Sequence, residues 1–173
     1  MAKLSYPLPP KAIEILKELA EIELQQESDY TYLSSCCAAM GFRHAKRRFQ
    51  EKSNMEESHF DRLTQLMLGR GYEPDVPATR EPEIEFTDLR SAIKYALELC
   101  VETMEIYEKK TREMFSIDLC TYQELLCYLS GIQCEIKEWA DLWKIFENVE
   151  DIKEQRAFEA MYFCAPSCES VIN

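Results

Sequence analysis

Three residues of metal-binding type recur at helical spacing early in the chain. Glu56 and His59 are three residues apart, so both side chains fall on one face of a helix, where they can reach a single ion. Glu23 stands in the middle of an earlier, largely apolar stripe. A buried carboxylate is costly unless it is paired or binds a metal. Because mixed carboxylate and imidazole ligands suit iron and zinc, these residues predict a metal site.

The residues around these candidates repeat in steps of three and four, which is typical of helices that bury one face. The first stripe is Leu16, Leu19, Glu23, Gln26, Tyr30, Leu33, Cys37 and Met40, and the second is Ala45, Phe49, Lys52, Glu56, His59, Leu63 and Leu66. The candidate ligands therefore face the interior. Lys52 is the one base beside them on these stripes, so a divalent cation would neutralise the cluster.

The same periodicity predicts one all-α domain over residues 1–173. The expected helices are about 10–40, 42–70, 87–115, 119–148 and 151–163. Gly41 leaves so short a join that the first two helices should be antiparallel. Three prolines in residues 71–86 forbid a helix there, and an extended segment of that length can return along the whole bundle. The pattern predicts a four-helix bundle with a long crossover between helices two and three and a short fifth helix.

Composition narrows the classes of function. The net charge of −12 disfavours nucleic acid as a partner. No apolar run approaches the ~18 residues of a membrane helix, and the first residues lack a signal-peptide core, so we expect a cytoplasmic protein. The eight cysteines include no C-x-x-C pair and should be reduced packing residues, although Cys164 and Cys168 are candidates for joining subunits or binding metal.

Taken together, these motifs resemble the non-haem ferritin and bacterioferritin family over nearly the whole chain. Glu56-x-x-His59 follows Glu23 by 33 residues, as in the bacterial members, and Tyr30 follows Glu23 by seven. Further points of similarity are His59-Phe60-Asp61-Arg62, Gly71 and Pro74 in the crossover, Thr87-Asp88-Leu89, and Ala160-Met161-Tyr162-Phe163. The resemblance implies a ferritin-like bundle that assembles as a homo-oligomeric cage, for which the fifth helix favours 24 subunits.

The resemblance also implies ferroxidase chemistry, in which Fe(II) is oxidised by dioxygen or peroxide and stored as Fe(III) mineral. Glu23, Glu56 and His59 would hold the first iron, and Tyr30 would hydrogen-bond a ligand carboxylate. Glu56 would bridge to a second iron near Cys100 and Gln133. No haem is expected, because Glu57 occupies the position of the haem-binding methionine.

The chain departs from the family at the second metal position. In register, the third-helix glutamate falls on Cys100, and a fourth-helix histidine or glutamate found in some members falls on Ile136. Glu98, two residues from Cys100, could substitute only after a local adjustment of its helix. The second position is therefore expected to be weakened.

Three other interpretations remain open. A catalytically impaired ferritin-like subunit would build a cage or scaffold without oxidising iron quickly. A rubrerythrin-type di-iron oxidase or peroxidase usually carries two Glu-x-x-His pairs, and this chain has one. A plain helical interaction module would use its buried polar residues only to set helix register.

Overall fold

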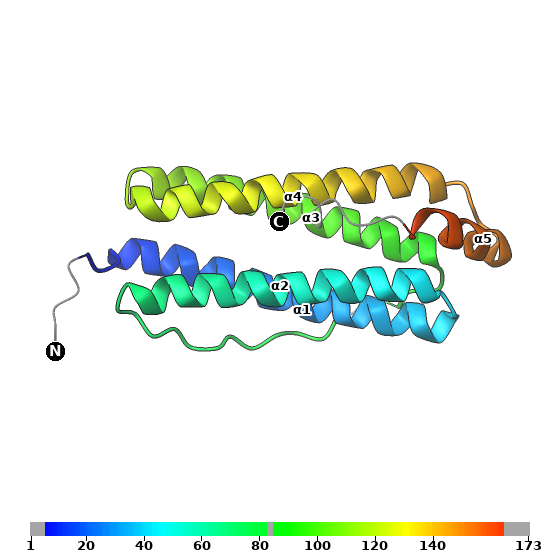
Figure 1. Cartoon of the computed structure of the whole chain (residues 1–173), viewed down its shortest axis with the longest axis horizontal. Coiled ribbons are helices and arrows are strands. Elements are labelled where there is room, and N and C mark those ends of the chain that lie inside the picture. The colour runs from blue at the N-terminus through cyan, green and yellow to red at the C-terminus, as the bar shows by residue number, and fades with distance from the viewer. Residues whose placement is uncertain (1–5, 83–84, 165–173) are drawn as a thin grey trace.

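The computed structural model describes residues 6–82 and 85–164. These residues form five helices: α1 (Pro10–Met40), α2 (Arg43–Gly69), α3 (Leu89–Phe115), α4 (Leu119–Phe146) and α5 (Ile152–Tyr162). No β-strand occurs among them. Helix α1 packs against α2 and α3 packs against α4, and the two antiparallel pairs lie side by side, with α5 across one end (Figure 1). The predicted all-α bundle with a short fifth helix is confirmed.

Two connections set the directions of the helices. Gly41 ends α1 with a φ of 83°, a left-handed conformation that glycine adopts without a Cβ clash, and the backbone amides of Gly41 and Phe42 bond back to the last turn of α1. The segment between α2 and α3 instead runs along the outside of the α1–α2 pair (Figure 1). Because it crosses the full length of the bundle, α3 starts at the same end as α2.

The bundle core consists of two apolar clusters separated by a polar layer. One cluster ends on α1 at Ala20, and the other begins on that helix at Tyr30. Each of the four long helices changes from one cluster to the other near its middle. The buried polar side chains that fall between the clusters include Glu23, Gln26, Lys52, Glu56, Thr103 and Glu135. Ionisable groups are thus concentrated at mid-height in the bundle, where they have to satisfy one another.

Helix α5 caps the starts of two other helices. The residue that precedes α2, Phe42, offers no side-chain cap, and Glu159 of α5 accepts a hydrogen bond from the backbone amide of Ala45 at 2.8 Å. Gln155 accepts one from the amide of Leu89 at 3.0 Å. Because the first amides of a helix lack partners within the helix, these contacts fix α5 onto the bundle end.

The structure also bears on the predictions made for the cysteines and for membrane-spanning segments. The seven cysteines within the described ranges are free thiols. Cys164 is exposed, with its Sγ 3.4 Å from His44 Nδ1, and Cys168 lies outside the described residues. None of the helices in the described part of the chain combines the length and apolar character needed to span a membrane.

Asp118 joins the C-terminal end of α2 to the N-terminal end of α4. Its carboxylate accepts a hydrogen bond from the backbone amide of Thr121 at 2.8 Å, which caps α4, and it pairs with Arg70 Nη2 at 2.8 Å. The hydrogen bonds from the Arg70 guanidinium, helped by Thr121 and opposed by burial, lower the pKa of Asp118 to about 2. The ionised carboxylate is therefore favoured by the folded state.

This pKa shift predicts an acid-sensitive contribution to stability. A carboxyl whose pKa is lower in the folded state stabilises that state fully when the pH is above the unfolded pKa of about 4. This stabilisation is lost as the pH falls towards the folded-state pKa. Asp118→Asn keeps a capping oxygen but loses the charge, so we expect the free energy of unfolding to drop by about 1–2 kcal/mol at pH 7. Urea denaturation should show the gap from wild type shrinking between pH 4 and pH 2. Exposed Asp75→Asn is the control, and a gap that is constant with pH would refute this assignment.

Candidate metal centre

Glu23 of α1 converges with Glu56 and His59 of α2 inside the polar layer. His59 Nδ1 lies 3.2 Å from Glu23 Oε2 and 3.0 Å from Glu56 Oε2. One ligand atom from each residue falls within 4.8 Å of the others, so a single ion can contact all three. The two carboxylates are nearly inaccessible, whereas the imidazole is 27% exposed. The structure therefore brings together the three residues whose spacing suggested a site.

A cavity of about 10 Å³ opens between these side chains. That volume suits about one water-sized body. Its remaining lining is Gln26, Cys100, Thr103, Ile132 and Glu135, so all four long helices contribute. Seven of its eight lining side chains, all except Ile132, carry an oxygen, nitrogen or sulfur atom, and such atoms are the donors that metal ions bind.

The electrostatics of the centre show how it is neutralised by protons. Burial raises the pKa of Glu56 to about 7, with the charge of Glu23 adding to the rise and the hydrogen bond from His59 opposing it. Burial also acts to lower the pKa of His59, but hydrogen bonds and Coulombic attraction from Glu23 and Glu56 outweigh it and raise the pKa to about 11. At neutral pH the imidazole is thus a cation that balances the carboxylates.

Tyr107 is the tyrosine that contacts a carboxylate of the centre. Its hydroxyl donates a hydrogen bond to Glu23, and its ring stacks on Tyr128 with ring centroids 5.7 Å apart. The resemblance implied that Tyr30 would take this role, but the Tyr30 hydroxyl instead lies 3.3 Å from Cys100 Sγ. Tyr107 falls within the predicted helix 87–115, but its hydrogen bond to Glu23 depends on packing between helices and could not be predicted from the sequence.

The fourth helix presents Glu135 to the cavity in place of Gln133. Gln133 is exposed, and the structure does not bring it to the Glu23–Glu56–His59 cluster. Glu135, two residues further, is buried and lines the cavity. Because side chains two residues apart point to different faces of a helix, burying Glu135 turns Gln133 towards solvent.

The two candidates on α3 lie in opposite environments. Glu98 has a side chain that is 58% exposed and pairs with Lys94 at 3.6 Å, so no helix adjustment has brought it to the centre. Cys100 is buried against the cavity, with its Sγ 3.4 Å from Glu135 Oε2. Burial raises the pKa of the Cys100 thiol well above its usual range, so it is a neutral group in this state.

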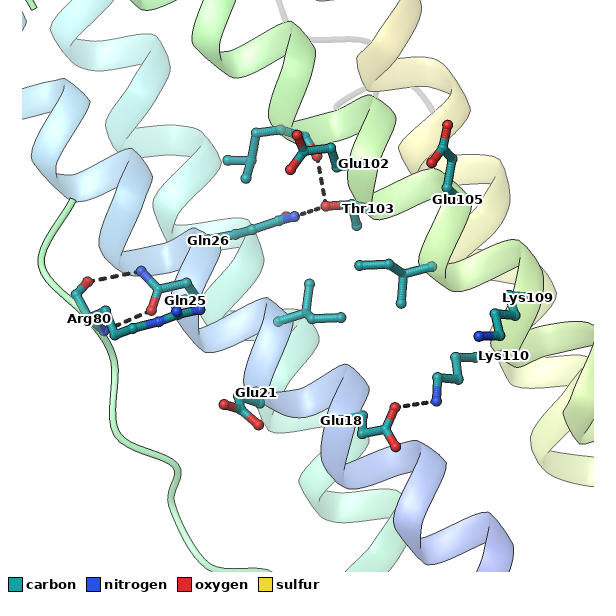
Figure 2. A pocket seen from close by; sticks show the side chains of 13 residues that line it. Glu18, Glu21, Gln25, Gln26, Arg80, Glu102, Thr103, Glu105, Lys109 and Lys110 are labelled. Carbon is teal, nitrogen blue, oxygen red and sulfur yellow. Dashed lines mark hydrogen bonds and ion pairs between the residues drawn. The ribbon is translucent and has the colours of Figure 1, made fainter. Parts of the chain in front are cut away.

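A larger pocket of about 680 Å³ lies outside the centre, between α1, α3 and the crossover. Gln26 and Thr103 line both the pocket and the inner cavity. Gln26 Nε2 donates a hydrogen bond to Thr103 Oγ1, joining α1 to α3 (Figure 2). Glutamates on both helices, including Glu18, Glu21 and Glu102, surround the opening. Gln26 and Thr103 are thus shared walls of the centre and the outer pocket.

Comparison with known proteins gives one family. The sequence profile of the ferritin-like domain matches residues 13–123, well over half of the chain. An open-pore ferritin from the hyperthermophilic archaeon Archaeoglobus fulgidus superposes with a TM-score of 0.84 at 17% identity, covering 91% of this chain and 98% of that one. A humanized archaeal ferritin superposes with a TM-score of 0.85 at 16% identity, covering 92% and 99%. No curated protein matches this chain in sequence.

The protonated centre predicts that metal binding releases protons. An ion that binds His59 Nδ1 has to displace its proton, and part of the Glu56 population also loses one near pH 7. Titrating the metal-free protein with Zn(II) in a weakly buffered solution should therefore release at least about one proton per bound ion. His59→Gln should weaken binding and abolish most of this release. Tight binding without a pH change would show that His59 is neutral or is not a ligand.

Proposed function

The chain belongs to the ferritin-like domain family, and from this premise we propose that it binds Fe(II), oxidises it and stores the Fe(III) within a protein cage. The observation that carries the proposal is the convergence of Glu23, Glu56 and His59 on a one-ion cavity inside the bundle. Fe(II) suits this mixed oxygen and nitrogen donor set, and its charge replaces the proton of His59.

Fe(II) is both the substrate and the cargo of this site. Glu23, Glu56 and His59 bind the first ion, and Tyr107 orients Glu23 through its hydrogen bond. Glu56, which lines the cavity together with Glu135, is the carboxylate that a second Fe(II) would share. Two Fe(II) ions each lose one electron, and dioxygen takes up these two electrons and two protons to become hydrogen peroxide. The Fe(III) then moves to the cage interior.

The second position is weak in this proposal. Cys100 is a neutral thiol where the resemblance places a glutamate, and Gln133 and Glu98 both face away from the cavity. Glu135 is the one carboxylate that α4 supplies there. We therefore propose one tightly held Fe(II) per subunit and a second that binds poorly.

The assembly and location follow from the same premise. We propose a homo-oligomeric cage, with 24 subunits favoured by the presence of α5, and no haem, because the candidate haem position is occupied by Glu57. The proposal places the protein in the cytoplasm, where its cysteines stay reduced. A catalytically impaired cage subunit is the second candidate, favoured by Cys100 at the third-helix position.

Removing one ligand should separate these candidates. Glu56→Gln keeps the shape of the side chain but lowers its charge, so we expect the initial rate of Fe(II) oxidation to fall by at least about tenfold. Oxygen uptake and Fe(III) absorbance measured on one preparation would report this rate. Glu57→Gln is the matched control, because Glu57 is the adjacent carboxylate and is exposed.

Particle size belongs to the same experiment. If the wild-type protein forms cage-sized particles but consumes no oxygen when Fe(II) is added, the catalytically impaired subunit is the correct function and the ferroxidase is not. Equal rates for Glu56→Gln and wild type would show that oxidation occurs elsewhere in the protein.

A further inference from the structure

Lys52 brings a second cation into the polar layer. It lies on α2 one turn before Glu56, and its side chain is 0% exposed. Its ammonium nitrogen lies 3.2 Å from Glu135 Oε1 and 3.6 Å from Glu138 Oε2, both on α4. An ammonium loses its hydration when it is buried, and these carboxylates replace it. Lys52 therefore forms a fixed ion pair between α2 and α4.

The partner of Lys52 is also a wall of the metal cavity. Glu135 lines the cavity with Glu23, Glu56 and His59, and its second oxygen, Oε2, lies 3.4 Å from Cys100 Sγ. Glu135 is thus the carboxylate best placed to bind a second ion beside Glu56. One of its oxygens is already engaged by the Lys52 ammonium.

Counting charges shows what the centre can accept. Glu23, Glu56 and Glu135 supply three negative charges, and Lys52 supplies one positive charge. Glu138 is balanced separately by Arg48, whose Nη1 lies 3.3 Å from Glu138 Oε1. One divalent ion bound to these residues, with His59 as a neutral ligand, brings this formal total to zero. A second divalent ion would leave two uncompensated positive charges in a dry core, which is strongly unfavourable.

We propose that the Lys52 ammonium takes the place of a second metal ion, so that each subunit holds one divalent ion tightly and not two. This inference rests on the proposed function, since it requires an ion at Glu23, Glu56 and His59. It assigns the weakness of the second position to a positive charge that α2 carries into the core. The presence of Cys100 where the family has a glutamate then contributes less to this weakness.

Neutralising Lys52 tests the inference directly. In Lys52→Met, Glu135 loses its counter-charge and becomes available, so anaerobic Fe(II) titration should rise from one tight ion per subunit to two. Lys52→Gln is the second variant, because its amide can still hydrogen-bond Glu135 and is easier to accommodate in the fold. Lys52→Arg retains the charge and should remain at one ion. Anomalous scattering at the iron edge from crystals soaked without oxygen would place the added ion between Glu56 and Glu135.

Each outcome separates the inference from the proposed function. Two tight ions in wild type, one ion in both neutral variants, or two ions in Lys52→Arg would each overturn the role of Lys52 while leaving the iron site intact. No tight ion in wild type would overturn the proposed function itself. In the double variant Lys52→Met with Glu135→Gln, the added ion should be lost again, because its carboxylate is gone.

Discussion

The structure depends on stabilising carboxylates that are buried in the bundle core, largely shielded from bulk water. Glu23, Glu56 and Glu135 lie at mid-height in the bundle and are almost fully buried. Each would cost several kcal/mol if it stood alone and ionised. Two protonated bases, His59 and Lys52, supply the compensating charge before any metal binds. The two apolar clusters on either side hold the helices firmly enough to keep these groups within contact distance.

The helical repeat explains why the polar groups meet. A step of three or four residues keeps Glu23 and Gln26 on one face of α1, and the same repeat aligns Lys52, Glu56 and His59 on α2. The Gly41 turn then makes α1 and α2 antiparallel, so that the middle of one helix lies against the middle of the other. The long crossover makes α3 start at the same end as α2, which brings Thr103 and Tyr107 to the same height.

The sequence was sufficient to predict the fold and the residues that α1 and α2 bring to the centre, but not those that α3 and α4 bring. On α1 and α2 only one stripe is apolar, so the inward face, and with it Glu23, Glu56 and His59, could be predicted. On α4 two adjacent stripes are apolar, one through Leu129 and Ile136 and one through Leu142 and Phe146, and periodicity cannot choose between them. Packing against α3 selects the second stripe, which buries Glu135 and exposes Gln133. Which hydroxyl reaches which carboxylate also depends on packing between helices.

The two compensating bases differ in what they allow. An imidazolium can give up its proton when a metal ion arrives, because the neutral ring is itself a ligand. A buried ammonium between two carboxylates keeps its charge and has no lone pair to offer while it is protonated. The side of the cavity near His59 is therefore exchangeable, and the side near Lys52 is fixed. Such a division fits the proposed function, in which the ion leaves after oxidation, because the fixed ammonium offsets part of the negative charge of the metal-free core and would repel a further cation from Glu135.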